Sequence, residues 1–251
     1  MQLTCLTINL KVDLPLTRKQ LKWSNRRMAV KTCIRSLNPD LIFAQEMSNE
    51  IYENMVEDFS HQYTIVKSKR SEKEKNGESL AVFLKKSVFS DVTLKTIWLS
   101  NTPSVTSKLT YSLKPRIATV INSTFKGQPL LFVNTHLDPL FPWVRNQQMA
   151  FLSKYIDLHQ VAIMGGDFNG NYNEKWFHRI SSIMRYVKPE NMHNTLHYGS
   201  GKIKRSKLPI DYLFVANDLK IVGSNIIDHP YDGIYPSDHF PIYLKVELFD
   251  H

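Results

Sequence analysis

The sequence predicts an α/β (α+β) protein in which two packed mixed β-sheets are flanked by helices, a four-layer α/β/β/α sandwich. Three observations favour this fold class. Short apolar segments typical of strands recur along the chain, helical patterns lie between several of them, and no Pro-, Gly- or Ser-rich linker divides the 251 residues. We therefore expect residues 1–251 to form a single domain.

In the first half of the chain, strands are expected to alternate with two helices. Residues 3–10 alternate as in a strand that ends near Asn9. A helix is expected from about residue 24 to 37, because the residue before proline in Asn38-Pro39 is pushed out of the helical region. The other expected elements are strands at 40–44, 63–66, 80–84 and 88–99, a helix at 48–59 and a charged loop at 67–77.

The second half predicts the same kinds of element. Strands at 116–125 and 129–134 flank the turn Lys126-Gly127-Gln128, as in a hairpin. The run Val161-Ala162-Ile163-Met164 is typical of a buried strand, and the two glycines after it allow a sharp bend before Asp167. The other expected elements are helices at 144–158 and 174–187, a long basic loop at 191–208 and strands at 210–216, 219–227 and 240–248.

Composition favours an anionic partner and disfavours a membrane-spanning protein. The formal net charge of +9 suits phosphate esters, nucleic acid or a lipid surface. The two cysteines, Cys5 and Cys33, lie in apolar segments and are expected to be reduced core thiols. No run approaches the length of an apolar membrane span, and Met1 to Leu10 does not read as a signal peptide. We expect a cytoplasmic monomer.

Polar side chains collect at the ends of the expected strands. They are Asn9, Glu46, Glu78, Arg116, His136, Asp167, Asn169, Asp211, Asp238 and His239. Asp167 and Asn169 would share one face of a strand, where they could hold a water against a phosphate. Glu46 is a hard oxygen ligand that suits Mg²⁺, with Asn9 and Asp238 nearby, whereas no His/Cys cluster has zinc spacing. An Asp that orients a His, beside an Asp that orients a water, is the usual layout for acid/base hydrolysis.

Each of these residues, taken singly, also has a structural explanation. Asp167 and Asn169 with their flanking glycines are typical of a turn, and Asp238 is a common turn residue. His136 could be a hydrogen-bonded core histidine, and Arg116 a charge at the edge of a strand. Only the ordered set favours catalysis over these alternatives.

Taken in their order along the chain, these residues resemble the motifs of the endonuclease/exonuclease/phosphatase superfamily of metal-dependent phosphohydrolases, which has the deoxyribonuclease I-like fold. Within this superfamily, the sequence most resembles the compact bacterial-type members. The resemblance covers almost the whole chain and is specific because all the motifs occur in family order. The matching segments are Thr7-Ile8-Asn9, Gln45-Glu46, Glu78, Arg116, Asn134-Thr135-His136-Leu137-Asp138, Gly166-Asp167-Phe168-Asn169, Ile210-Asp211-Tyr212 and Ser237-Asp238-His239.

The resemblance implies a cation site and a water-activating group. Glu46 would be the principal Mg²⁺ ligand, with Mn²⁺ as an alternative cation, and would be helped by Asn9 and Asp238. Asp167 would orient or deprotonate the attacking water. Asn169 would bind a phosphate oxygen. A cation at this place would offset the charge that gathers on the phosphoryl oxygens in the transition state.

The resemblance also implies two imidazoles at the phosphate. His239 would contact the scissile phosphate, with Asp211 fixing its tautomer and orientation. His136 would bind the phosphate or assist the leaving group, with Glu78 as its partner. Arg116 would lie near the same pocket.

Residues around the expected pocket bear on the substrate. Trp143 follows Pro142 in an expected loop beyond His136 and could stack on a base or a sugar. The basic loop residues could steer a polyanion to the site, or could form an ordinary solvated loop. These residues are Lys202, Lys204, Arg205 and Lys207.

The implied activity is Mg²⁺-dependent hydrolysis of a phosphate-ester substrate, with a phosphodiester favoured over a monoester. A nuclease acting on DNA or RNA is the narrower alternative. Abasic-site repair is disfavoured, because the repair enzymes usually carry a Lys where this chain has Ser48 and a Tyr and Asn in the segment that contains His136. A catalytically inactive binding module is disfavoured as well, because none of the core motif residues is lost.

Overall fold

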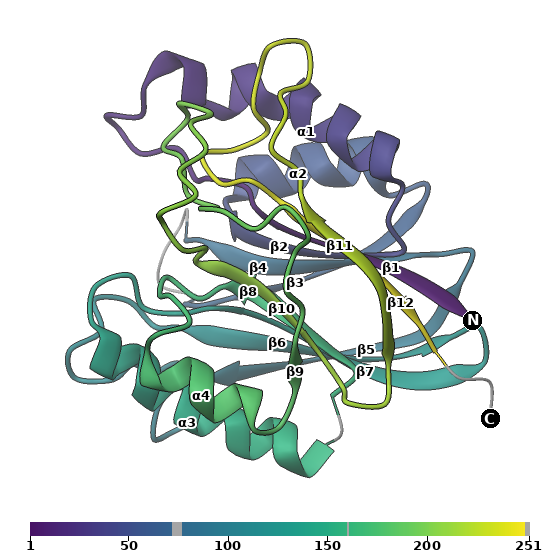
Figure 1. Cartoon of the computed structure of the whole chain (residues 1–251), viewed down its shortest axis with the longest axis vertical. Helices are drawn as coiled ribbons and strands as arrows, with labels where there is room; N and C mark the ends of the chain where they lie inside the picture. The colour runs from purple at the N-terminus through teal and green to yellow at the C-terminus, as the bar shows by residue number, and fades with distance from the viewer. Residues whose placement is uncertain (72–76, 160, 249–251) are drawn as a thin grey trace.

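The structure is a computed structural model that describes residues 1–71, 77–159 and 161–248. It confirms the four-layer α/β/β/α sandwich (Figure 1). Two six-stranded mixed sheets pack face to face, with helices α1 and α2 outside one sheet and α3 and α4 outside the other. The loop expected at 67–77 begins too early, because strand β3 continues to Lys69, where it pairs with β4. The expected loop also falls partly on residues 72–76, which lie outside the described residues.

The first sheet has the strand order β11-β12-β1-β2-β4-β3. Strands β1 and β2 are parallel, and α1 connects them, while the neighbours β12 and β4 run antiparallel to this pair. The elements of this half are β1 (Gln2–Asn9), the short helix η1 (Lys19–Leu21), α1 (Trp23–Leu37), β2 (Leu41–Met47), α2 (Asn49–Phe59), β3 (Tyr63–Lys69), β4 (Ser79–Lys85), β11 (Lys220–Ile226) and β12 (Ile242–Glu247).

The second sheet has the order β5-β6-β7-β8-β10-β9 and repeats the plan of the first. Strands β7 and β8 are parallel, α3 connects them, and β6 and β10 flank them in the antiparallel sense. The elements are β5 (Phe89–Trp98), β6 (Ile117–Phe125), β7 (Gln128–His136), α3 (Pro142–His159), β8 (Ile163–Asp167), α4 (Lys175–Ser181), β9 (Arg185–Tyr186) and β10 (Asp211–Val215). Each sheet therefore has a central parallel pair with its own crossover helix.

Strand periodicity divides the apolar side chains of each sheet between a core that lies between the two sheets and a core beneath that sheet's own helices. On β1, Cys5 packs between the sheets, whereas the next residue, Leu6, packs toward α1 and α2. On β2, Phe43 faces the other sheet and Ile42 faces the helices. Because successive side chains of a strand point to opposite faces, each central strand contributes to both layers. Both cysteines are free and buried, as the sequence predicted.

The prediction of one helix over residues 174–187 is wrong at its C-terminal end. Helix α4 ends at Ser181, and residues 185–186 form strand β9, which pairs with β10. The apolar periodicity continues past the end of α4, but Tyr186 lies opposite Phe214 at the edge of the sheet. Pairing with a sheet edge here overrides a local helical pattern.

A buried polar link joins the two sheets. Asn134 on β7 accepts a hydrogen bond from Gln45 Nε2 at 2.8 Å and donates to the carbonyl oxygens of Ala44 and Ala81, each at 3.0 Å. Gln45 immediately precedes Glu46, and Asn134 lies two residues before His136. The link therefore fixes the strand ends that carry these two residues.

Among the described residues, no helix is long and apolar enough to cross a lipid bilayer.

We expect Asn134→Ala to lower the free energy of unfolding by about 2–3 kcal/mol, because it removes three buried hydrogen bonds and leaves partners in the core unsatisfied. Urea unfolding followed by circular dichroism measures this change. The matched control is Asn122→Ala on the exposed side of β6, which should change the stability by less than about 0.5 kcal/mol. Equal losses in the two variants would show that the link does not stabilise the sheet packing.

Candidate active site

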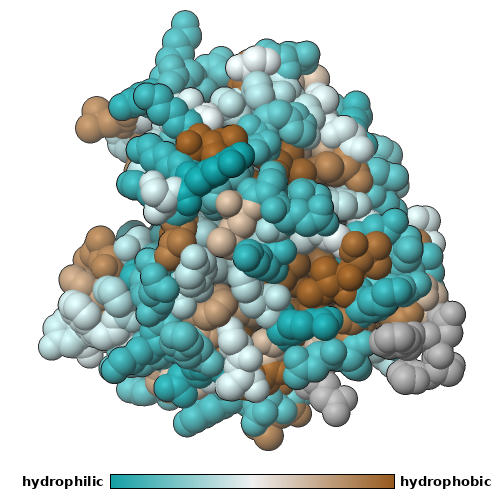
Figure 2. Space-filling model, viewed as in Figure 1, coloured by the Kyte–Doolittle hydropathy of each residue, from teal (hydrophilic) through white to brown (hydrophobic). Residues whose placement is uncertain are grey.

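The carboxyl ends of β1, β2, β7 and β8 bring four polar side chains together. Asn9 Nδ2 donates to Glu46 Oε1 at 3.1 Å and to Asp167 Oδ2 at 2.9 Å, so it connects carboxylates from both sheets. His136 Nε2 lies 3.6 Å from Asp167 Oδ2. Strand β1 runs leftward from the N-terminus in Figure 1, and the outline of the molecule in Figure 2 is indented on the same side.

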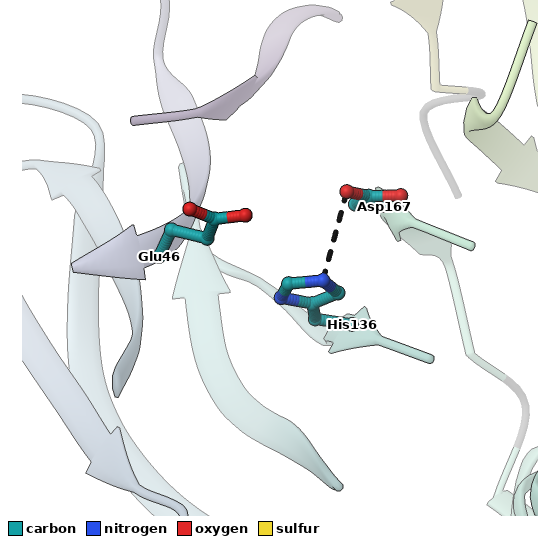
Figure 3. A group of neighbouring side chains, drawn as sticks. All are labelled: Glu46, His136 and Asp167. Carbon is teal, nitrogen blue, oxygen red and sulfur yellow. Dashed lines mark ion pairs between the residues drawn. The ribbon is translucent and has the colours of Figure 1, made fainter. Parts of the chain in front are cut away.

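Glu46 leaves the regular strand geometry. Its φ is 55°, and the β2–β4 register shifts between Ala44 and Met47, as at a β-bulge. The carboxylate is held from its other side, because Oε2 accepts a hydrogen bond from the Val12 amide at 2.9 Å. The bulge therefore re-aims Glu46 toward the second sheet, where Figure 3 shows it facing His136 and Asp167.

Asp167 depends on the glycine before it. Gly166 has φ +146°, and a Cβ at this position would lie 1.9 Å from the Thr135 carbonyl oxygen. Only glycine allows β8 to approach β7 this closely. Beyond the strand, the Asn169 amide donates to Asp167 Oδ1 at 2.8 Å, and Asn169 Nδ2 donates to the Leu137 carbonyl at 3.1 Å. Both oxygens of Asp167 are therefore held in place.

The second imidazole comes from the segment before β12. Asp211 begins β10 and lies opposite Asp167 in the ladder. His239 Nδ1 is 2.9 Å from Asp211 Oδ2 and 4.0 Å from Asp167 Oδ2. Thr195 orients this part of the site, since its hydroxyl oxygen accepts the backbone amides of Ile210 and Asp211 at 3.0 and 3.2 Å.

The two histidines have opposite electrostatic surroundings. Burial, reinforced by the Arg116 charge, holds the pKa of His136 well below its usual value. Burial alone would also lower the pKa of His239, but the Asp211 and Asp167 carboxylates raise it well above that value. Burial and the Asp211 charge raise the pKa of Asp167 to about 7. These surroundings therefore favour a neutral imidazole at His136 and a charged one at His239, beside a carboxyl group whose pKa is raised to about 7.

The expected cation ligands are only partly together. Glu46, His136 and Asp167 each offer an atom, and these atoms lie within 4.8 Å of one another. The amide oxygen of Asn9 accepts a hydrogen bond from the Lys11 amide at 2.9 Å, so Asn9 meets the carboxylates through its nitrogen. Asp238 is buried and accepts from Ser237 Oγ at 3.3 Å. Together with Glu46, its charge opposes the lowering of the Arg26 pKa by burial.

Arg26 is a residue of the site that the sequence did not reveal. It is fully buried, and its guanidinium donates to the carbonyls of Leu21, Pro236 and Lys11 at 2.7 to 2.8 Å. It thereby holds the segment that follows Asn9 against the segment that precedes Asp238. The signal in the sequence is a charged residue on the apolar face of α1, which Trp23, Val30 and Ile34 also occupy.

Glu78 does not have the partner expected for it. Among the described residues, its carboxylate bonds to Arg70 at 2.8 and 3.2 Å rather than to His136. Glu78, Arg70, Arg116 and His136 nevertheless line one small cavity. Arg70 was missed by the sequence analysis because nothing in its local pattern marks it.

Trp143 lies apart from this cluster in the described structure. It sits in the first turn of α3 rather than in a loop, because Pro142 begins that helix and proline is favoured at a first helical position. It is 53% exposed and stacks on Phe141 with ring centroids 4.5 Å apart. It lines a separate groove with Leu109 and Tyr111.

A groove much larger than the cavity at Glu78 also lies away from the cluster. It measures about 830 Å³ and runs past Asp91, Gln128, Asp157 and Asp218. None of the expected site residues lines it. The volume of this groove therefore does not make it the candidate active site.

Comparison with known proteins gives one family and many similar structures. The Endonuclease/Exonuclease/phosphatase family matches residues 6–239. A Bacteroides thetaiotaomicron protein of that family is 22% identical, with 98% of this chain and 97% of that chain covered and a TM-score of 0.90. The Bacteroides thetaiotaomicron mannosyl-6-phosphatase is 21% identical, with 98% and 100% covered and a TM-score of 0.90.

A more distant similar structure is D. rerio TDP2 complexed with single-strand DNA product. It is 18% identical, with 98% of this chain and 99% of that chain covered and a TM-score of 0.77. No curated protein matches this chain by sequence. At these identities the solved structures establish the shared fold.

We expect Thr195→Val to destabilise the protein by about 2 kcal/mol, because two backbone amides beside Asp211 lose their acceptor. Thermal or urea unfolding measures this loss. Thr119→Val is the matched control, because the buried Thr119 hydroxyl has no hydrogen-bond partner among the described residues and its replacement should be neutral or stabilising. A Thr195→Val variant as stable as Thr119→Val would contradict the positioning role of Thr195.

Proposed function

Because the chain belongs to the endonuclease/exonuclease/phosphatase family, we propose that it is a Mg²⁺-dependent hydrolase of phosphate esters and that its 251 residues act as one catalytic domain. The observation that carries this proposal is the cluster at the strand ends. Two sheets bring the carboxylates of Glu46, Asp167 and Asp211 together with the imidazoles of His136 and His239. Such a set of side chains would bind a phosphate group and activate a water molecule, whatever the leaving group is.

The donor set fits a hard divalent cation. Glu46 and Asp167 supply carboxylate oxygens within a few ångströms of one another, and no thiolate lies in either cluster of the described residues. Oxygen donors favour Mg²⁺ or Mn²⁺ over softer metals. Glu46 would be the main ligand, with Asp238 from a neighbouring segment. Asn9 would join them only after turning its amide oxygen, which accepts from the Lys11 amide, toward the cation. The bound cation would supply charge stabilisation to the phosphoryl oxygens.

Asp167 would orient or deprotonate the attacking water. Asn9 and the Asn169 amide each hold one of its oxygens, so the carboxylate cannot rotate away. A pKa of about 7 allows it to accept a proton at neutral pH. Asn169 would bind a phosphate oxygen from the turn that follows.

The two imidazoles have complementary tasks. His239 is charged because of Asp211 and would donate to a phosphoryl oxygen, where it stabilises negative charge. His136 is neutral and can accept or donate a hydrogen bond at the leaving group. Arg116 supplies a further positive charge beside His136.

Two substrate classes fit this chemistry. The sequence favours a phosphodiester, and a nuclease is the narrower form of that activity, supported by the exposed basic residues of the 202–207 segment. A phosphomonoester is the other class, supported by the arginines at His136. Trp143 lies in the first turn of α3 and lines a separate groove, so its contact with substrate stays a prediction. The cytoplasmic location and the monomeric state are also predictions from the sequence.

We expect Asp167→Asn and His239→Ala each to lower turnover by about 10²-fold or more, because one removes the proton acceptor and the other a charge-stabilising donor. Steady-state assays with Mg²⁺ on p-nitrophenyl esters measure the loss. The exposed residues Asp157 and His61 provide matched controls as Asp157→Asn and His61→Ala. Catalytic variants within a few-fold of these controls would show that the roles are assigned wrongly.

We also expect EDTA to abolish turnover and Mg²⁺ or Mn²⁺ to restore it, because the carboxylate cluster requires a cation to bind an anionic substrate. The assay covers bis-p-nitrophenyl phosphate, p-nitrophenyl phosphate, single- and double-stranded nucleic acid and phospholipid. No metal-dependent turnover of any of them would refute the proposed function. Turnover of the monoester alone would refute the preference for diesters.

A further inference from the structure

Arg26 carries a buried charge that the proposed chemistry does not use. Its side chain is fully buried, and its three hydrogen bonds all end on backbone carbonyl oxygens, those of Leu21, Pro236 and Lys11. A charged group in the interior costs free energy unless hydrogen bonds replace its hydration. The carbonyls offset this cost, and the guanidinium in turn joins segments of the chain that lie up to 210 residues apart.

One of these contacts leads to Glu46, the proposed cation ligand. Arg26 holds the Lys11 carbonyl oxygen, and the next residue, Val12, donates its backbone amide to Glu46 Oε2 at 2.9 Å. Lys11 has φ 54°, a left-handed conformation that a residue with a side chain keeps only where its surroundings hold it. The guanidinium therefore fixes the 11–13 segment in the conformation that directs the Val12 amide at Glu46.

Another contact leads to Asp238, the second expected ligand. Pro236, whose carbonyl oxygen accepts from Arg26 at 2.7 Å, lies two residues before the buried Asp238. The backbone carbonyl of Asp238 accepts the amides of His197 and Tyr198 at 2.9 and 3.2 Å, which holds the same segment from its other side. Arg26 thus ties the segment that carries Asp238 to the 11–13 segment.

The charge of Arg26 acts on the same region. Burial lowers the pKa of its guanidinium, and the negative charges of Asp13, Asp238 and Glu46 oppose this lowering. The guanidinium is therefore close enough to both expected ligands for its charge to repel a cation bound between them. Removal of the charge alone would strengthen cation binding, whereas removal of the hydrogen bonds would weaken it by freeing the ligands.

We infer that Arg26 is a positioning residue for the cation site, because its hydrogen bonds hold Glu46 and Asp238 in place, and that this effect outweighs the repulsion by its charge. The inference rests on the proposed function, which places the cation at Glu46. Loss of a group that orients metal ligands from behind typically weakens metal binding by about 10- to 100-fold, because the ligands must then be ordered when the metal binds.

Asp13 supports this arrangement from the other end of the 11–13 segment. Both of its carboxylate oxygens accept the Trp23 amide at 3.1 Å, at the start of α1, and Oδ1 lies 4.0 Å from Arg26 Nη2. Since Asp13 directly follows Val12, it anchors the segment to the helix that also carries Arg26. Its side chain is 33% exposed, so it can be replaced with little effect on the core.

The test is the affinity for Mn²⁺, measured by titration against the electron paramagnetic resonance signal of free Mn²⁺. Arg26→Lys keeps the positive charge, but a single ammonium group cannot reach three carbonyls as the planar guanidinium does. We expect Arg26→Lys to weaken Mn²⁺ binding about tenfold or more. Glu46→Gln should weaken it at least as much, which locates the measured binding at this site.

Ile34→Ala is the matched control for a purely structural effect. Ile34 is buried on the same helix as Arg26, in the core between α1 and its sheet, so its truncation destabilises the protein without changing the 11–13 segment. Its Mn²⁺ affinity should equal that of the wild type, and urea unfolding shows how far each variant is destabilised. An Arg26→Lys variant that binds Mn²⁺ as tightly as Ile34→Ala would overturn the positioning role.

The Asp13 variants give a second comparison that leaves Arg26 in place. Asp13→Asn removes the same charge as Asp13→Ala but keeps an acceptor oxygen for the Trp23 amide, so Asp13→Ala should bind Mn²⁺ more weakly than Asp13→Asn. If Arg26→Lys does not fold, this pair decides, and equal affinities would overturn the inference.

Failure of the proposed function would look different. If the wild type binds Mn²⁺ but hydrolyses no ester, the proposed function fails, and the titrations still decide the role of Arg26. If the wild type binds no Mn²⁺, or Glu46→Gln binds it as the wild type does, the cation is not at Glu46 and the inference fails together with the cation site.

Discussion

The Asn9 amide holds the active site together. It donates to Glu46 on the first sheet and to Asp167 on the second, and it thereby offsets the repulsion between two carboxylates that face each other across the sheets. The Gln45–Asn134 link lies directly beneath and fixes the same strands. The site forms only when both sheets pack in this register. The packing of the two sheets therefore also determines the geometry of the site residues.

The repeated strand plan explains where the residues come from. Each sheet has a parallel pair with a crossover helix, and the carboxyl ends of such strands meet at one edge. One pair delivers Asn9 and Glu46, and the other delivers His136 and Asp167. The antiparallel neighbour β10 then begins at this edge and adds Asp211, close to the segment that precedes β12. Neither sheet alone holds both Glu46, the proposed cation ligand, and Asp167, the proposed water-activating group.

The sequence predicted the four layers and the strand ends because both follow from local patterns. Alternation on β1 and β2 marks the strands, and a polar residue after an apolar run marks the end of a strand. It did not predict the end of α4, where pairing of Tyr186 with the sheet edge outweighs helical periodicity. It also missed Arg26, whose guanidinium joins segments that only the fold brings near. It missed Arg70 as well, which takes the carboxylate of Glu78 eight residues along the chain in place of the expected pairing of Glu78 with His136.

A crystal structure of the protein with Mn²⁺ and inorganic phosphate would test the central claim most directly, because the anomalous signal locates the cation. We predict a cation bound to the Glu46 carboxylate at about 2.0–2.3 Å, the usual range for a hard cation and oxygen. The phosphate should lie between His136 and His239, with one oxygen directed toward Arg116. A cation bound away from Glu46, or a phosphate that contacts neither imidazole, would contradict the account.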